Sequence, residues 1–165
     1  MILVDNSVSQ ELLSQLNDEI EVLYQQRAWS VSNHTWDHGL TAGIYGPVSS
    51  ADVSFGLLQK IKKELKQHLP SVECSYNYNV WHCESGIRFH SDSNYMFGAT
   101  LYLNEWNKKW GGLFIWEDKD EAFHCICPKP GLLVINTEKE LHTVTNISPE
   151  ARYPRRSLQI FCSVV

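Results

Sequence analysis

The chain lacks any long hydrophobic run. None of its apolar segments approaches the ~18 residues that a membrane-spanning helix requires. The first five residues also lack the charged and apolar regions of a signal peptide. We therefore expect a cytoplasmic protein that does not enter a membrane.

Cysteine is scarce and shows no recognisable spacing. The five cysteines are an odd number and contain no Cys-x-x-Cys pair, which argues against both a disulfide framework and a thiolate zinc site. We expect all five to be reduced. They are Cys74, Cys83, Cys125, Cys127 and Cys162.

An excess of positive charge is also missing. The formal net charge is −5 and the pI is about 5.8, which excludes a broad electrostatic attraction to nucleic acid or to anionic membranes. One local group of lysines is interpreted as the solvated face of a helix. It consists of Lys60, Lys62, Lys63 and Lys66.

The sequence contains no linker, internal repeat or low-complexity tract. Its 165 residues with 43% hydrophobic content are suited to a single domain with a full core. We expect residues 1–70 to be a helical support region and residues 71–165 to be a β core. Nothing in the composition predicts the oligomeric state.

The hydrophobic pattern predicts an α+β chain that is mainly β. A short strand is expected at residues 1–5, and apolar residues at helical spacing predict helices from Ser7 or Ser9 to Gln26 and over residues 50–68. Two helices followed by many short strands are typical of a jelly roll buttressed on one sheet. The expected later strands are residues 73–83, 99–103, 113–116, 123–127, 132–136, 141–146 and 155–164.

The most informative motif is His90-Ser91-Asp92, with His142 well downstream. In a strand, side chains alternate between faces, so His90 and Asp92 are expected to point the same way. His142 lies in a segment of strand-like composition that could fold across a barrel or sandwich. Two imidazoles and one carboxylate on one side of a divalent metal leave the other side open, as in non-haem Fe(II) sites.

An arginine follows the second histidine. By strand alternation Arg155 shares a face with Ser157, and a guanidinium with an adjacent hydroxyl is suited to a buried carboxylate. We expect Arg155 to lie beside His142 on the neighbouring strand. Arg152 and Arg156 compete for the same role.

Taken together, these motifs resemble the 2-oxoglutarate/Fe(II)-dependent dioxygenase superfamily, and most closely its prolyl-hydroxylase-like branch. The resemblance covers roughly residues 76 to 163, and each motif is specific only in combination with the others. The motifs are Gly86-Ile87-Arg88-Phe89-His90-Ser91-Asp92, Ala99-Thr100-Leu101-Tyr102-Leu103-Asn104, Trp110-Gly111-Gly112-Leu113, Pro130-Gly131-Leu132-Leu133-Val134, His142-Thr143-Val144 and Arg155-Arg156-Ser157-Leu158.

The resemblance implies a double-stranded β-helix with Fe(II) on His90, Asp92 and His142. It also implies that Arg155 and Ser157 bind the distal carboxylate of 2-oxoglutarate. With O2, such an enzyme hydroxylates an unactivated C–H bond, and a prolyl residue of a peptide or protein is the first substrate to consider. A free amino acid or small metabolite is the alternative, because a fold does not specify a substrate.

The sequence departs from the family pattern at the second co-substrate contact. Trp81 stands where many relatives carry a tyrosine, and an indole cannot supply a phenol. Leu101 stands where some relatives use another tyrosine, and we expect Tyr102 to point to the other face.

Two further features suggest contact with a substrate. The segment of residues 33–45 carries Trp36, Asp37, His38 and Tyr45 among glycines, a composition that suits either an ordinary connection or a lid. His34 is a further candidate in the same segment. Arg88 would reach the substrate entrance only if no bulge interrupts its strand.

Two other functional classes remain open on the sequence alone. A His-His-Asp zinc hydrolase would use metal-bound water as its nucleophile, but it has no use for a buried Arg-x-Ser. A non-catalytic jelly-roll binding module would retain the metal and turn over no co-substrate.

Overall fold

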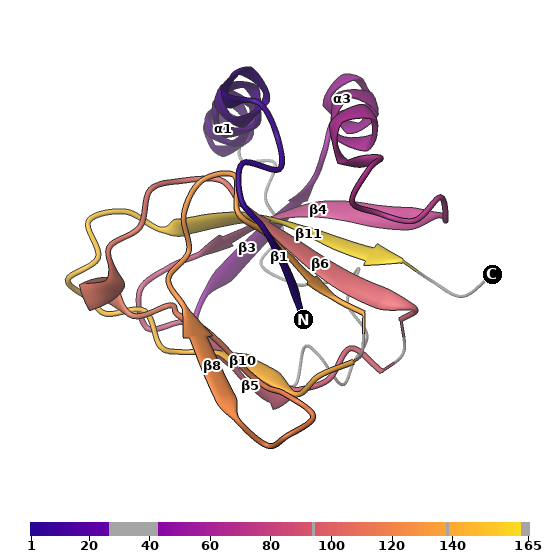
Figure 1. Cartoon of the computed structure of the whole chain (residues 1–165). Helices are drawn as coiled ribbons and strands as arrows, with labels where there is room; N and C mark the ends of the chain where they lie inside the picture. The colour runs from indigo at the N-terminus through magenta and orange to yellow at the C-terminus, as the bar shows by residue number, and fades with distance from the viewer. Residues whose placement is uncertain (27–42, 94, 138, 163–165) are drawn as a thin grey trace.

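Two antiparallel sheets face each other, and two helices cover the outer side of the larger sheet (Figure 1). This computed structural model describes residues 1–26, 43–93, 95–137 and 139–162. The larger sheet has the order β1 (Ile2–Val4), β9 (Leu133–Asn136), β6 (Phe97–Tyr102), β11 (Arg155–Cys162), β4 (Cys74–Trp81) and β3 (Val48–Asp52). The smaller has the order β2 (Ile44–Tyr45), β5 (Gly86–His90), β10 (His142–Val144), β7 (Phe114–Glu117) and β8 (Phe123–Ile126). A short 3₁₀ helix, η1 (Lys108–Trp110), precedes β7.

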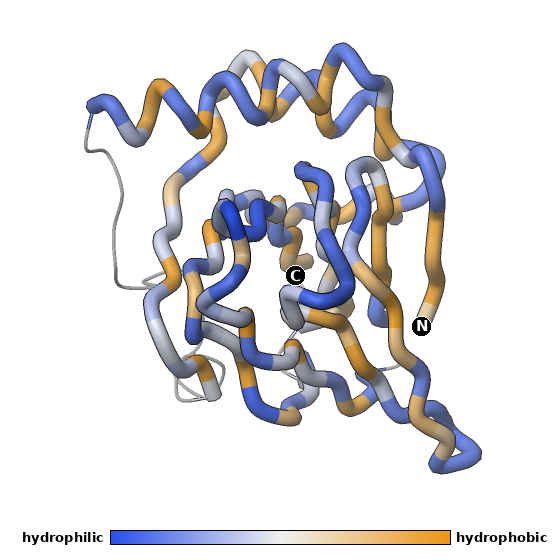
Figure 2. The backbone as a smooth tube through the Cα atoms, turned by 90° about the vertical axis from the view of Figure 1, so that its left-hand side faces the viewer, coloured by the Kyte–Doolittle hydropathy of each residue, from blue (hydrophilic) through white to orange (hydrophobic). Residues whose placement is uncertain are grey.

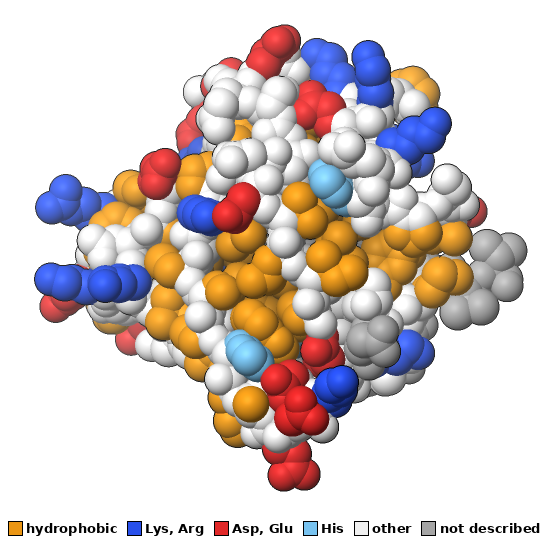
Figure 3. Space-filling model, in the orientation of Figure 1, with side chains coloured by type: hydrophobic (Ala, Val, Ile, Leu, Met, Phe, Trp, Pro, Cys, Tyr) orange, Lys and Arg blue, Asp and Glu red, His pale blue; other side chains and the backbone are white. Residues whose placement is uncertain are grey.

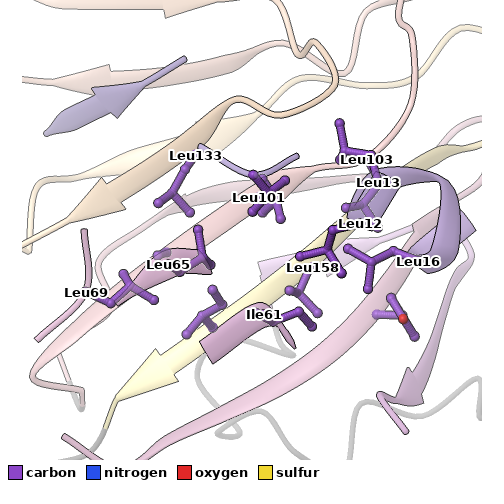
Figure 4. Packing of buried hydrophobic residues seen from close by; sticks show 14 of the residues in the cluster. Leu12, Leu13, Leu16, Ile61, Leu65, Leu69, Leu101, Leu103, Leu133 and Leu158 are labelled. Carbon is purple, nitrogen blue, oxygen red and sulfur yellow. The ribbon is translucent and has the colours of Figure 1, made fainter. Parts of the chain in front are cut away.

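The helices α1 (Gln10–Gln25) and α3 (Phe55–Leu65) each bury one apolar stripe. Ser9 caps α1, because its hydroxyl accepts the N–H of Leu12. Figure 2 shows hydrophobic positions recurring along both helices, which lie above the sheets. These stripes pack on the outer face of the larger sheet, as Figure 4 shows for Leu12, Leu16, Ile61, Leu101 and Leu158.

The expected mainly β architecture with two buttressing helices is confirmed. The first helix and all seven later strands lie close to the predicted residues. The second helix was predicted to begin at Ser50, which is wrong, because Val48–Asp52 forms β3 and the helix begins at Phe55. The reason is tertiary: β3 pairs along β4, and the Ser50 hydroxyl donates to Asn79 Oδ1 over 2.6 Å instead of capping a helix.

The expectation that all five cysteines are reduced is also wrong. The structure joins Cys74 and Cys162 in a disulfide, while Cys83, Cys125 and Cys127 are free. The two bonded cysteines are 88 residues apart in the chain, but they are direct partners at one end of the β4–β11 ladder. Counting cysteines cannot reveal a pair that only strand register brings together.

The lysines of α3 are exposed, as their interpretation as a solvated helix face requires. Figure 3 shows basic side chains around this helix and acidic side chains at the tip of the β7–β8 hairpin. Lys60 bonds to Gln15 of α1 over 2.8 Å, and Lys62 lies over the Tyr76 ring. Among the described residues, no helix is long and apolar enough to span a bilayer.

Candidate active site

The structure brings His90, Asp92 and His142 together between the sheets. One candidate ligand atom from each lies within 4.8 Å of the others. The Nε2 atoms of His90 and His142 lie 3.8 and 3.7 Å from the Asp92 carboxylate oxygens. Asp92 and His142 are buried, His90 is half-buried, and all three line one cavity.

A bulge in β5 turns His90 into this cavity. The ladder pairs His142 with His90 but Val144 with Ile87, so β5 contains one residue more than β10 over this stretch. An extra residue reverses the alternation of side chains. Ile87 and His90 therefore both line the cavity, whereas Arg88 and Phe89 are exposed. The bulge removes the condition under which Arg88 was expected to lie with His90.

Asp92 reaches the site from beyond the strand, not from the strand face that was predicted. β5 ends at His90, and the chain then turns, with the Tyr95 N–H donating to the Asp92 carbonyl over 3.0 Å. The carboxylate fits against Gly98 of β6. A Cβ atom at Gly98 would lie 2.3 Å from Asp92 Oδ2, so only glycine leaves room for this ligand.

Both histidines present Nε2 to the site because their Nδ1 atoms are already bonded. His90 Nδ1 lies 2.8 Å from the Arg88 carbonyl oxygen, and His142 Nδ1 lies 2.8 Å from that of Glu140. A carbonyl only accepts, so each Nδ1 carries the proton and each Nε2 keeps a lone pair. Burial lowers the pKa of both rings, for His90 with a further contribution from His142, which favours the neutral form that binds metal.

Arg155 lines the same cavity. It enters from β11 of the larger sheet, so the expectation that it neighbours His142 on an adjacent strand is wrong; the two face each other across the sandwich. Its side chain is only 2% exposed, and Nη1 donates to the Gly112 carbonyl over 2.6 Å. The guanidinium lies 5.0 Å from the Trp81 ring centre and 5.6 Å from that of Tyr102.

Several polar groups around Arg155 are buried without a partner among the described residues. They are Arg155 Nε, the Tyr102 hydroxyl and Asn79 Nδ2. Ser157, between Asn79 and Tyr102 in the sheet register, makes only a 3.4 Å bond to the Asn79 carbonyl. Unsatisfied buried donors are costly, so this group has the character of an anion site.

Tyr102 was missed by the sequence reasoning. Tyr102 was expected to face away, but it lines the cavity, and Leu101 instead packs under the helices. Burial raises the pKa of the Tyr102 phenol, so it remains a donor. The alternation within β6 could have identified it, because Gly98, Thr100 and Tyr102 share the cavity face.

The competing arginines are engaged elsewhere or exposed. Arg156 points to the opposite face of β11, where it contacts Glu21 and bonds to Asn17 Oδ1 over 3.1 Å. Arg152 is exposed. Trp36, Asp37, His38 and His34, in the segment interpreted as a connection or a lid, lie outside the described residues. Tyr45 of the same segment forms part of β2.

The cavity lies between the two sheets and is lined by residues of both. Two neutral imidazoles and a carboxylate line it, together with a buried guanidinium and a phenol that has no partner among the described residues. The first set fits a divalent metal, and the guanidinium with the phenol fits a carboxylate. A small molecule that chelates the metal at one end and carries a carboxylate at the other would bridge these two sites.

Comparison with known proteins identifies the family. Residues 72–163 match the 2OG-Fe(II) oxygenase superfamily, so the chain belongs to this superfamily. It is a 2-oxoglutarate/Fe(II)-dependent oxygenase that uses Fe(II), 2-oxoglutarate and O2. A zinc hydrolase and a non-catalytic module are thereby set aside. No curated protein matches the sequence.

Solved structures share the complete fold at low identity. A Pseudomonas putida prolyl-4-hydroxylase has a TM-score of 0.72 and 18% identity, over 99% of this chain and 92% of its own. A Trichoplax adhaerens prolyl hydroxylase, solved with a hypoxia inducible factor peptide fragment, has a TM-score of 0.71 and 14% identity, over 98% of this chain and 82% of its own. The viral collagen prolyl hydroxylase of Paramecium Bursaria Chlorella virus-1, solved with 2OG, has a TM-score of 0.67 and 12% identity, over 99% of this chain and 96% of its own.

Proposed function

We propose that this protein hydroxylates a prolyl residue of a peptide or protein. The supporting observation is that the metal cluster and the Arg155 site lie in one cavity on a fold shared with prolyl hydroxylases. A neighbour solved with a peptide fragment makes a peptide the first substrate class to test. We further propose that residues 1–165 form one catalytic domain and that the protein acts in the cytoplasm.

In this proposal His90, Asp92 and His142 would hold Fe(II). Bound iron and 2-oxoglutarate supply, with O2, the oxidation that places a hydroxyl group on a substrate C–H bond while the co-substrate becomes succinate and carbon dioxide. The protein keeps both imidazoles neutral and aims their Nε2 atoms through the Arg88 and Glu140 carbonyls. The chain thus contributes orientation and a water-poor site.

Arg155 and Ser157 would bind the distal carboxylate of 2-oxoglutarate, with Tyr102 as an additional donor. The guanidinium is already fixed by Gly112 and by the two flanking rings, so little side-chain freedom is lost on binding. The Tyr102 phenol takes the place of the tyrosine that is missing at Trp81. A carboxylate here would satisfy donors that are otherwise buried without partners.

The test is turnover with matched substrates. The protein is incubated with Fe(II), 2-oxoglutarate and O2 together with proline-containing peptides, their alanine counterparts, and free amino acids. The proposal predicts succinate formation and a gain of one oxygen atom on proline in the peptides only. Oxygen gained on a free amino acid, or on a residue other than proline, would contradict the prolyl substrate while leaving the oxygenase class intact.

A further inference from the structure

Asn136 connects the turn between β9 and β10 to the metal cluster. It is the last residue of β9, it is 4% exposed, and it lines the cavity opposite Gly98 in the sheet register. Its side-chain Oδ1 accepts the Glu140 N–H over 2.9 Å, and its Nδ2 donates to the Glu140 carbonyl over 3.1 Å. One side chain thereby fixes both backbone groups of Glu140.

The same carbonyl holds His142. His142 Nδ1 lies 2.8 Å from the Glu140 oxygen and 3.2 Å from Asn136 Nδ2. Both nitrogens are donors, so they lie side by side on one acceptor, which has a lone pair for each. The direction of that carbonyl, and with it the orientation of the His142 ring, therefore depends on Asn136.

We propose that Asn136 is a positioning residue for the metal, an inference that rests on the proposed function. By clamping Glu140 it holds the proton of His142 on Nδ1 and keeps Nε2 pointed at Asp92, from which it lies 3.7 Å. Groups that orient metal ligands in this way change metal affinity when they are removed, even though they do not touch the metal.

Asn104 offers a matched control. Its side chain also makes two hydrogen bonds to the backbone. Nδ2 donates to the Pro154 carbonyl over 3.1 Å, and Oδ1 accepts the Arg156 N–H over 2.8 Å. It contacts none of the three metal-site residues in these bonds. Asn104→Leu should therefore reduce stability in the same way as Asn136→Leu without disturbing His142.

The experiment titrates the metal-free protein with Co(II) alone and records its visible absorption bands. Asn136→Leu should weaken Co(II) binding by roughly 10- to 100-fold and change the bands, because the ring of one ligand is no longer held. Asn104→Leu should leave both unchanged. If Asn136→Leu does not fold, Asn136→Ser serves instead, since its hydroxyl is too short to span both backbone groups.

The possible results separate the positioning role of Asn136 from the proposed function. Equal affinity and equal bands in the wild type and the Asn136 variants would overturn the positioning role while leaving the proposed function standing. Equal losses in the Asn136 and Asn104 variants would also overturn it, since general loosening would then explain the effect. Absence of Co(II) binding to the wild type would overturn both proposals.

Discussion

Gly98 leaves the space that the Asp92 carboxylate occupies, because an added Cβ atom would lie 2.3 Å from Asp92 Oδ2. Gly98→Ala should therefore displace the carboxylate and weaken metal binding by about 10-fold or more. Gly56→Ala is the matched control, since Gly56 in α3 has no atom within 4 Å of an added Cβ. Calorimetric titration with metal compares the two variants. A Gly98→Ala protein with wild-type affinity would show that Asp92 is not held where the structure has it.

Tyr102 should contribute to co-substrate binding and not to metal binding. Tyr102→Phe removes one donor to a buried carboxylate, which should weaken 2-oxoglutarate by ~10-fold or more. Arg155→Ala should cause a larger loss, since it removes the charge. Metal affinity, measured separately, should stay the same in both variants. If metal and co-substrate weaken equally, the site has unfolded and the donors have not been tested.

Buried histidines make the metal-free protein sensitive to acid. Burial lowers the pKa of His82, His90 and His142 below the ordinary value of 6.5. Below that value the unfolded chain binds more protons than the folded one, so stability is complete above pH 6.5 and falls as the pH drops toward the lowered pKa values. Urea unfolding of the metal-free protein should give a smaller free energy at about pH 5.5 than at about pH 7.5. A larger free energy of unfolding at the acidic pH would contradict this prediction.

At the scale of the residue, the sequence predicted which side chains come together but not the direction of each one. His90, Asp92, His142, Arg155 and Ser157 were identified by spacing and by resemblance, and all five line one cavity. Tyr102 was assigned to the wrong face. No sequence pattern pointed to Asn136, because only the folded chain brings the Glu140 backbone against its side chain.

At the scale of the element, the bulge in β5 decides what the strand presents. It turns His90 inward beside Ile87 and sends Arg88 to the surface. Regular alternation predicted His90 and Asp92 on one strand face. Both residues line the cavity, but the bulge and the turn after His90 bring them there, not alternation. A bulge depends on pairing with β10, which lies more than fifty residues downstream in the sequence, so no local pattern reveals it.

The two faces of strand β11 make different contacts. Arg155 faces the cavity, while Arg156 bonds to Asn17 and contacts Glu21 of α1. Arg156→Ala should therefore lower the free energy of unfolding by ~1 kcal/mol or less, because Glu21 is largely exposed, and should leave 2-oxoglutarate affinity unchanged. Thermal unfolding and co-substrate titration measure the two effects. A strong loss of 2-oxoglutarate affinity in this variant would contradict this prediction and indicate that Arg156 binds the co-substrate carboxylate.

At the scale of the whole molecule, the two sheets supply different halves of the site. His90 and His142 come from the smaller sheet, and Arg155, Ser157 and Tyr102 come from the larger one. The fold class was predictable, since two amphipathic helices followed by short strands leave few alternatives. The facing of the two sheets was not, because strand order and register are set by pairings that are remote in the sequence.

The central claim is that one cavity holds Fe(II) and 2-oxoglutarate together. Anaerobic titration with both should produce a visible charge-transfer band in the wild type. The band should disappear in His142→Ala, and in Arg155→Ala it should require far more 2-oxoglutarate. A band that survives unchanged in His142→Ala, or that never forms in the wild type, would contradict the claim.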